Sequence, residues 1–495
     1  MLIGSHTLDV DSGNEQIYNA LDCCLTFEVF NELKKQLPSA EPTYAFERAL
    51  QAPVLEMMLR GFRVNPEARE EALKEARAEL KLLEKNIEDL ASAILNCELP
   101  KHRVTGRLTL PSSGPQLKTL FYNYLGIEPV KTWVKGEMKF QMNREVLEKI
   151  EDYFQARPIV ACILAYRDLD KQIQVLETEV DNDWRMRTSY NIGGTKTGRF
   201  SSSKSTTGSG GNLQNITEDL RYIFIPDPGY ILCGIDAEQS DSRMVGFMCG
   251  LLFDDWTYLD ACESGDLHTY VARLTWPEKK WTNDLKKDRE IAEENFYRHH
   301  SHRDMCKRLG HGANFLGKAP TLSKETHVPI SIVSFFLERY FGGFPAILKL
   351  QAWHASEIQR SKQLTSIFGR TRDFFDRVDA DETIRKALAF TAASATADNL
   401  NLGMLRIWKN MPQVQLLAQV HDAVYFQFPE TLDANEIIKE AQRNLTVTLF
   451  APNGRKFSVP TEAKTGYNWG KHTPGNPEKG ILEKNPKGLK KFKVK

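Results

Sequence analysis

The sequence lacks the features that identify several classes of protein. No apolar stretch approaches the length that spans a bilayer, and the first residues show no basic-then-apolar signal pattern. The eight cysteines are scattered, without a CxxC pair or a Cys/His cluster, which argues against a disulfide framework and against structural zinc. The formal net charge is zero, so any nucleic-acid binding depends on local basic patches. We expect a protein of the cytoplasm (of a host cell's cytoplasm if a phage encodes it) without membrane association.

The composition is that of a globular protein with more than one core. The chain has 495 residues, of which 41% are hydrophobic and 26% are charged. A single ordinary core does not extend over this length, so two to four subdomains are expected.

The most informative stretch is 230–250. A short apolar run over 231–235, preceded by two prolines and a glycine, predicts a buried strand that ends at Asp236. Apolar residues at helical spacing then predict a helix. A carboxylate at this point is costly to desolvate unless it is paired or holds a cation. Asp236 is therefore interpreted either as the N-cap of the following helix or as a metal ligand.

A second stretch, 414–429, favours the metal. It predicts two strands with His421 and Asp422 at their tight connection. Two strands that each present an aspartate near a turn can bring both carboxylates to one point at a sheet edge. Oxygen-only ligands suit Mg²⁺, and two such ions form the clamp for in-line phosphoryl transfer.

These residues resemble the family A (polymerase I-like) DNA polymerases. The run 236–243, DAEQSDSR, is similar to the family's motif A, and QVHD at 419–422 is similar to its motif C. The resemblance extends over most of the chain. It implies an α+β right-hand fold with an antiparallel-sheet palm and mostly helical fingers and thumb. It also implies two Mg²⁺ ions held by Asp236, Asp422 and the carbonyl of Ala237.

A helix within 284–318 carries four functional candidates at strict intervals of four: Arg303, Lys307, His311 and Phe315. Cations, an imidazole and an aromatic ring on one helix face suit a triphosphate and a stacked base. The alternative is an exposed basic helix face. The stretch resembles motif B, with His311 and Phe315 in place of two aromatic residues of the family, and the change at His311 is expected to alter discrimination against dideoxynucleotides.

The resemblance implies further contacts to nucleotide and DNA. Gln239, Asp241 and His268 are expected to bind the incoming dNTP, and Asp241 stands where the family has a glutamate that blocks the ribose 2′ position. The expected DNA contacts are Arg199, Asn212, Gln214, Asn215, Arg372, Arg385 and His421. From the residues alone, the Ser/Gly-rich stretch 185–216 is equally readable as a linker.

The predicted domain organisation follows the order of these motifs. We expect the end of a 3′–5′ exonuclease-like region at 1–40, within which Tyr18 and Asp22 lie on one amphipathic helix. A thumb at 41–185 is built on a helical hairpin, 67–96 and 144–180, and has a basic tip. The palm comprises 186–260 and 360–470, the fingers 261–359, and a basic flexible tail 471–495.

The predicted function is template-directed addition of dNTPs to a primer 3′-hydroxyl in DNA replication. The expected partners are primer–template DNA, dNTPs and a separate exonuclease or processivity subunit. The short N-terminal region and the motif departures favour a phage enzyme without a complete exonuclease domain. A single-subunit RNA polymerase and a catalytically inactive DNA-binding relative are the alternatives.

Overall fold

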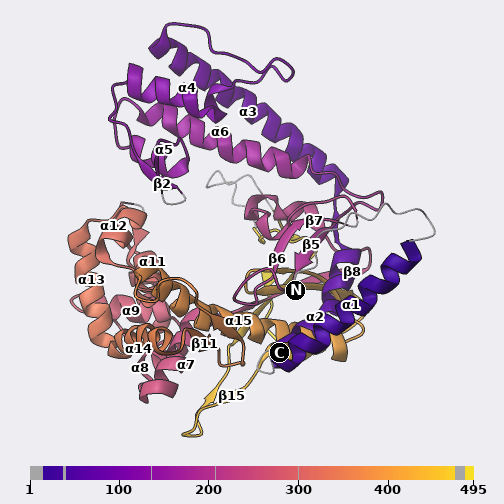
Figure 1. The fold of residues 1–495 in the computed structure, drawn as a ribbon. Helices are drawn as coiled ribbons and strands as arrows, with labels where there is room; N and C mark the ends of the chain where they lie inside the picture. The colour runs from indigo at the N-terminus through magenta and orange to yellow at the C-terminus, as the bar shows by residue number, and fades with distance from the viewer. Residues whose placement is uncertain are drawn as a thin grey trace.

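The computed structural model describes residues 15–36, 41–134, 137–206, 208–298, 300–473 and 485–494. Figure 1 shows two long helices, α3 (Pro66–Leu95) and α6 (Arg157–Leu176), at one end of the molecule. A separate group of helices that includes α11 (His302–Asn314) lies at another end. A five-stranded antiparallel sheet connects the two groups and has the order β13-β14-β8-β17-β18.

The sheet is built on β8 (Tyr230–Ala237), the strand predicted from the apolar run over 231–235. Its neighbours are β14 (Ala423–Pro429) and β17 (Thr461–Gly466), and β13 (Gln415–Val420) lies beyond β14. Alternate residues such as Cys233 and Ile235 are fully buried, in a core shared with α2 (Glu41–Arg60), α15 (Asp381–Asn410) and α16 (Ala434–Leu445). These helices therefore cover one face of the sheet, and on the other face Leu232 and Tyr425 pack in a core with residues of α3 and α6.

The helix predicted from Glu67 to about Asn96 is α3, and both of its ends follow from the sequence. The Asn65 side chain accepts hydrogen bonds from the backbone N–H groups of residues 67 and 68, and Pro66 takes the first turn. Asn96 ends the helix with φ 51°, in the left-handed region. Leu80 and Ile87, apolar residues seven positions apart on α3, pack in one core with residues of α6, which lies within the second arm of the predicted hairpin.

The second arm of this hairpin differs from the prediction of a single segment 144–180. It consists of α5 (Arg144–Ile150) and α6, separated at residues 151–156. Pro158 lies in the first turn of α6, where its missing N–H costs no intrahelical hydrogen bond, whereas within a continuous helix it would break one.

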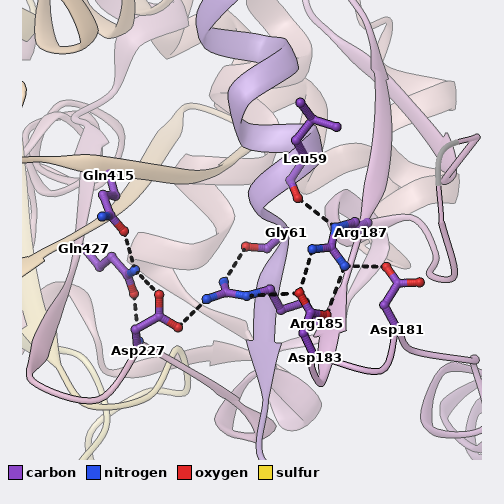
Figure 2. A network of polar contacts seen from close by, with 9 residues as sticks. All are labelled: Leu59, Gly61, Asp181, Asp183, Arg185, Arg187, Asp227, Gln415 and Gln427. Carbon is purple, nitrogen blue, oxygen red and sulfur yellow. Dashed lines mark hydrogen bonds and ion pairs between the residues drawn. The ribbon is translucent and has the colours of Figure 1, made fainter.

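A network of arginines and carboxylates joins the hairpin to the sheet (Figure 2). Arg185, in β4 (Arg185–Met186), donates to Asp227 at 2.5 Å, and Gln427 of β14 donates to the same carboxylate at 2.7 Å. Arg187 donates to Asp183 at 2.7 Å and to the carbonyl of Leu59 at 2.7 Å. The segment that follows the hairpin is thereby fixed against both the end of α2 and the central sheet.

The helices after β8 form a second core around Met305, Leu309, Phe336 and Tyr340. The long helix α15 also contributes to this core through Ala392 and Ala395, so it links the helical group to the sheet. The members of the group, besides α11, are α7 (Ser240–Phe253), α8 (Thr257–Glu263), α9 (Leu267–Thr275), α10 (Leu285–Ala292), α12 (Ala319–Thr326), α13 (Ile330–Gly343) and α14 (Pro345–Ser361).

The remaining elements are short. The strands are β1 (Phe62–Val64), β2 (Thr132–Val134), β3 (Glu137–Lys139), β5 (Thr188–Asn191), β6 (Ser201–Lys204), β7 (Phe224–Ile225), β9 (Asn295–Tyr297), β10 (His300–Ser301), β11 (Gln363–Thr365), β12 (Thr371–Asp373), β15 (Leu449–Phe450) and β16 (Lys456–Phe457). The helical turns are η2 (Leu110–Ser112), α4 (Gly114–Lys118), η3 (Thr119–Tyr124), η4 (Leu213–Asn215) and η5 (Glu218–Ile223).

Two predictions for the ends of the chain are wrong in part. Tyr18 and Asp22 lie on the expected helix, α1 (Glu15–Gln36), but this helix buries none of its residues, so its apolar side chains do not form a packed face in the described chain. Of the tail expected to be flexible, residues 485–494 are packed instead. Strand β18 (Lys490–Lys491) pairs with β17, and Leu489 is buried, because β17 offers an otherwise unpaired edge.

The other domain boundaries stay predictions. Residues 1–14, 37–40 and 474–484, on which parts of those predictions fall, lie outside the described residues. Among the helices that are described, none combines the length and the apolarity that crossing a membrane requires.

A buried ion pair provides a test of this packing. Arg370 donates to Asp398 of α15 at 2.9 Å, and both side chains are less than a tenth exposed. We expect Arg370→Met to lower the free energy of unfolding by about 3–5 kcal/mol, because it leaves a buried carboxylate unpaired. Arg377→Met is the control, since its pair with Asp379 is exposed and should contribute little to stability. Equal urea midpoints for the two variants would contradict this role of the buried pair.

Candidate active site

The two aspartates singled out by the sequence lie on adjacent strands. Asp236 is the penultimate residue of β8, and Asp422 lies in the two-residue turn between β13 and β14. The ladder pairs Asp236 with Ala423, and the N–H of Ala237 donates to the carbonyl of Asp422 at 3.1 Å. Asp236 is therefore a strand residue and not the N-cap of α7, a position that Gln239 takes.

The backbone next to each aspartate has an uncommon conformation. His421, directly before Asp422, has φ 54°, and Gln239, three residues after Asp236, has φ 53°. Non-glycine residues in the left-handed region cost free energy and persist where the surrounding structure enforces them, frequently at functional sites. The side-chain oxygen of Gln239 is in addition buried without a hydrogen-bond partner.

Both carboxylates are harder to ionise than an ordinary aspartate. Desolvation by the surrounding protein raises the pKa of Asp236 to about 6, and the negative charge of Asp422 adds to this effect. Desolvation likewise raises the pKa of Asp422, against the opposing charge of Arg199. The side chain of Asp236 is nevertheless open to solvent, so a cation has access to it.

A guanidinium group lies between two carboxylates at this site. Arg199 is 3.5 Å from Asp422 and 3.3 Å from Asp241. Asp241 also accepts a hydrogen bond of 2.8 Å from the hydroxyl of Thr396, and Thr396 accepts one of 3.0 Å from Ser240. Arg199, expected to contact DNA, therefore neutralises the acidic cluster in the protein without DNA.

Thr396 is a site residue that sequence reasoning missed. It is almost fully buried and fixes the carboxylate of Asp241. One signal could have found it, because Thr396 is a polar residue in the alanine-rich run 392–397, AASATA.

A cavity of about 800 Å³ opens beside Asp422. Arg303, Lys307 and His311 of α11 line it together with His268 of α9, as the intervals of four predicted. Gln239 and Asp241 line it too. Phe315 lies one residue past the end of α11 and is not among the lining residues, although its ring is 5.0 Å from that of His311.

Asp266 holds the wall of this cavity together. It caps α9 by accepting hydrogen bonds from the N–H groups of residues 268 and 269, and it accepts one of 2.8 Å from Arg303. The guanidinium of Arg303 is thereby fixed to the helix that carries His268. Sequence reasoning missed this role of Asp266, although its position before an apolar helical run is a cap signal.

His268 is not a cation in the protein without substrate. Burial lowers its pKa to about 4, and the positive charge of Arg303 contributes to the same shift. At neutral pH the imidazole is therefore uncharged. His268 therefore lines the cavity as an uncharged side chain in this state, and the cations among the lining residues are Arg303, Lys307 and Arg308.

The residues expected to contact DNA, besides Arg199, differ in their surroundings. Asn212 and Gln214 hold their own loop, since Ser202 bonds to both side chains and Gln214 donates to the carbonyl of Gln419 at 3.3 Å. Asn215, His421 and Arg385 are exposed. Arg372 lies over the ring of Phe374, at 4.7 Å.

The donor atoms fit magnesium. Among the described residues, no group of three or more His, Cys, Asp or Glu side chains that could hold a metal occurs. Mg²⁺ characteristically takes one or two carboxylates and completes its shell with waters and substrate phosphates. The arrangement of Asp236, Asp422 and the carbonyl of Ala237 matches that requirement, and the position of the Arg199 guanidinium indicates that positive charge is favourable there.

Comparison with known proteins identifies the family. The sequence model of DNA polymerase family A matches residues 80–471, more than half of the chain. The chain belongs to the family A DNA polymerases. This result favours the DNA polymerase over the RNA polymerase alternative.

Similar proteins include DNA polymerase I of Helicobacter pylori (strain J99), 26% identical over 82% of this chain and 42% of that protein. The thermostable DNA polymerase I of Thermus aquaticus is 27% identical over 69% of this chain and 40% of its own. This family A chain thus spans less than half the length of these relatives.

The fold is also that of a solved polymerase structure. The POL domain of Pol1 from M. smegmatis, in complex with DNA primer-template and dNTP, superimposes with a TM-score of 0.70 at 20% identity. The match covers 90% of this chain and 74% of that one. The expected α+β right-hand fold is therefore confirmed.

The raised pKa of Asp236 predicts how metal binding depends on pH. The folded protein holds this proton more tightly than the unfolded chain does, so ionising Asp236 costs stability as the pH rises from about 4 to about 6. A bound cation must displace the same proton. We expect the affinity for Mn²⁺, measured by electron paramagnetic resonance, to fall about tenfold per pH unit below pH 6.

Two variants serve as controls for that measurement. Asp236→Asn should abolish the pH dependence together with most of the binding, and Asp89→Asn, at an exposed position of α3, should behave like the unchanged protein. An affinity that stays constant from pH 7 to pH 5 would contradict a metal site at Asp236.

Proposed function

We propose that this chain is a template-directed DNA polymerase that adds dNTPs to a primer 3′-hydroxyl. The observation that carries the proposal is the meeting of two carboxylates at one sheet edge beside a cavity lined by Arg303 and Lys307. Membership of the family A DNA polymerases supports it. A primer–template duplex and a dNTP accompany the similar mycobacterial domain, and we propose the same substrates for this chain.

Each residue has a defined task in this proposal. Asp236, Asp422 and the carbonyl of Ala237 would hold two Mg²⁺ ions. When bound, such ions lower the pKa of the attacking hydroxyl and stabilise charge on the leaving pyrophosphate. Arg303, fixed by Asp266, and Lys307 bind the triphosphate as cations.

The remaining residues position nucleotide and DNA. The neutral His268 donates a hydrogen bond to the triphosphate, and Phe315 and His311 form the surface for the base and sugar. Arg199 leaves the carboxylate cluster when DNA and metal arrive, and then contacts the duplex. The further DNA contacts are Asn212, Gln214, Asn215, Arg372, Arg385 and His421.

A catalytically inactive relative is the alternative. It is disfavoured because Asp236, Asp422, Arg303 and Lys307 are all retained and all line cavities that meet at the sheet edge. Phage origin, proofreading on a separate chain and a processivity partner stay predictions of the sequence.

Primer extension tests the proposed chemistry. With Mg²⁺ and a primed template, the unchanged chain should extend the primer with dNTPs. Asp422→Asn and Asp236→Asn should each slow extension by about a hundredfold or more, because each removes a charge that acts on the transition state. Asp89→Asn, an isosteric change far from the sheet edge, should leave the rate unchanged. Wild-type rates in Asp422→Asn would disprove the assignment.

Sugar selection provides an independent test of the nucleotide cavity. Asp241 is one methylene shorter than the family's glutamate, and Thr396 holds it in place. Asp241→Glu should therefore reduce incorporation of ribonucleotides relative to deoxyribonucleotides, by about tenfold. Thr396→Val, which removes the hydroxyl but keeps the shape, should increase it, and Thr396→Ser should not. An incorporation ratio that is the same in all four proteins would show that Asp241 does not face the sugar.

A further inference from the structure

A second cavity, of about 560 Å³, adjoins the first at the two aspartates. Successive residues line opposite cavities: Asp236 faces the second and Ala237 the first, and His421 faces the second and Asp422 the first. The first cavity combines metal ligands with cations, which assigns it to the triphosphate. The nucleotide site does not include the lining of the second cavity, where Gln214, Asn215 and His421 are proposed DNA contacts.

In-line phosphoryl transfer gives the second cavity a role. The attacking and leaving oxygens lie on opposite sides of the phosphorus atom in such a reaction. When the leaving pyrophosphate occupies the first cavity, the primer 3′-hydroxyl must approach from the other side of the aspartates. The strand that ends in this hydroxyl then lies along the second cavity, and its phosphates require cations there.

The sheet register places two lysines on the face that carries Asp236. In the ladder Asp236 is paired with Glu462, Gly234 with Lys464, and Lys464 with Lys491. Directly paired residues, and residues two apart on one strand, lie on the same face of a sheet. Ile235 and Ala463, one position away, are buried in the core on the opposite face. Lys464 also lines the second cavity.

These lysines carry more charge than their neighbour can neutralise. Glu462 is the shared partner, 3.3 Å from Lys464 and hydrogen-bonded to Lys491. Glu462 balances one ammonium group, and the other acts on Asp236, so the lysines have a surplus positive charge when Asp236 holds a cation instead. Both lysine side chains remain accessible, 44% exposed for Lys464 and 57% for Lys491.

The rest of the cavity suits a sugar–phosphate strand. Arg221 supplies a further cation and lies over the ring of Trp469, at 4.7 Å. Gln214 and Asn215 supply amides, and Glu218 is the carboxylate on that wall. Contacts from lysines and amides to phosphate position a nucleic-acid strand without reading its sequence.

We propose that Lys464 and Lys491 bind phosphates of the primer strand near its 3′ end, and that β18 is part of the DNA-binding surface. The proposal rests on the proposed polymerase function and adds a site to it. Lys491 lies beyond residue 471, where the match to the family model ends.

The test is equilibrium binding of a primer–template duplex to the full chain. Fluorescence anisotropy measures the binding constant K at a series of salt concentrations. Each phosphate contact that is lost should reduce the slope of log K against log[salt] by about 0.9. Lys464→Ala and Lys491→Ala should each show this loss. Between 50 and 200 mM salt, the affinity of each variant should fall about threefold less than that of the wild type.

Two further variants separate binding from a structural role. Glu462→Gln releases both lysines from their carboxylate partner and should tighten binding, which a purely structural ion pair would not do. Lys439→Ala is the matched control, since Lys439 is exposed on α16, which packs against the opposite face of the sheet. Its salt slope should equal that of the wild type.

The outcomes distinguish this inference from the proposed function. The inference would be overturned if the salt slopes and the thermal midpoints were both unchanged in Lys464→Ala, Lys491→Ala and the double variant. Primer extension by the wild type would still support the polymerase in that case. Reduced slopes with an unchanged KM for dNTP would support it, because the lysines then act on the primer and not on the nucleotide.

Discussion

The arrangement of the site depends on the pairing of β8 between β14 and β17. The antiparallel register with β14 puts Asp236 opposite Ala423, the residue that follows Asp422, so two carboxylates are held close together although they are 186 positions apart in sequence. Buried side chains such as Ile235 and Val424 fix this register, because a shift by one residue would turn them towards solvent. The free energy of the apolar core thus holds two carboxylates in a position that raises their pKa values.

The chain compensates for that unfavourable proximity with cations. Without substrate, Arg199 lies against Asp422 and Asp241, and Lys464 moderates the pKa of Asp236 from the neighbouring strand. The two counter-charges come from different elements, and Lys464 also lines the second cavity. Under the proposed mechanism, both exchange their carboxylate contacts for phosphates when DNA, nucleotide and metal bind.

The elements nearest the site could be predicted from sequence, because local patterns specify them. The apolar run before Asp236 and the tight turn at His421 each have a local physical cause, and each lies where the sequence predicts it. The intervals of four on α11 likewise placed three side chains on one cavity wall.

Features that depend on tertiary contacts could not be predicted in the same way. The roles of Thr396 and Asp266 follow from partners 155 and 37 residues away. The neutral state of His268 follows from burial, which spacing does not reveal. The composition of the lysine-rich C-terminal segment predicts a flexible tail. The structure shows that part of it pairs with the edge of β17, which places Lys491 beside Lys464.

The most direct test of the proposed site is a crystal structure with primer–template, a non-hydrolysable dNTP analogue and a divalent cation. We expect the cation between Asp236 and Asp422, the triphosphate along Arg303 and Lys307, and the primer end in the second cavity. We also expect Arg199 to have left the carboxylates. A triphosphate bound outside the first cavity, or a cation that contacts neither aspartate, would contradict the proposed site.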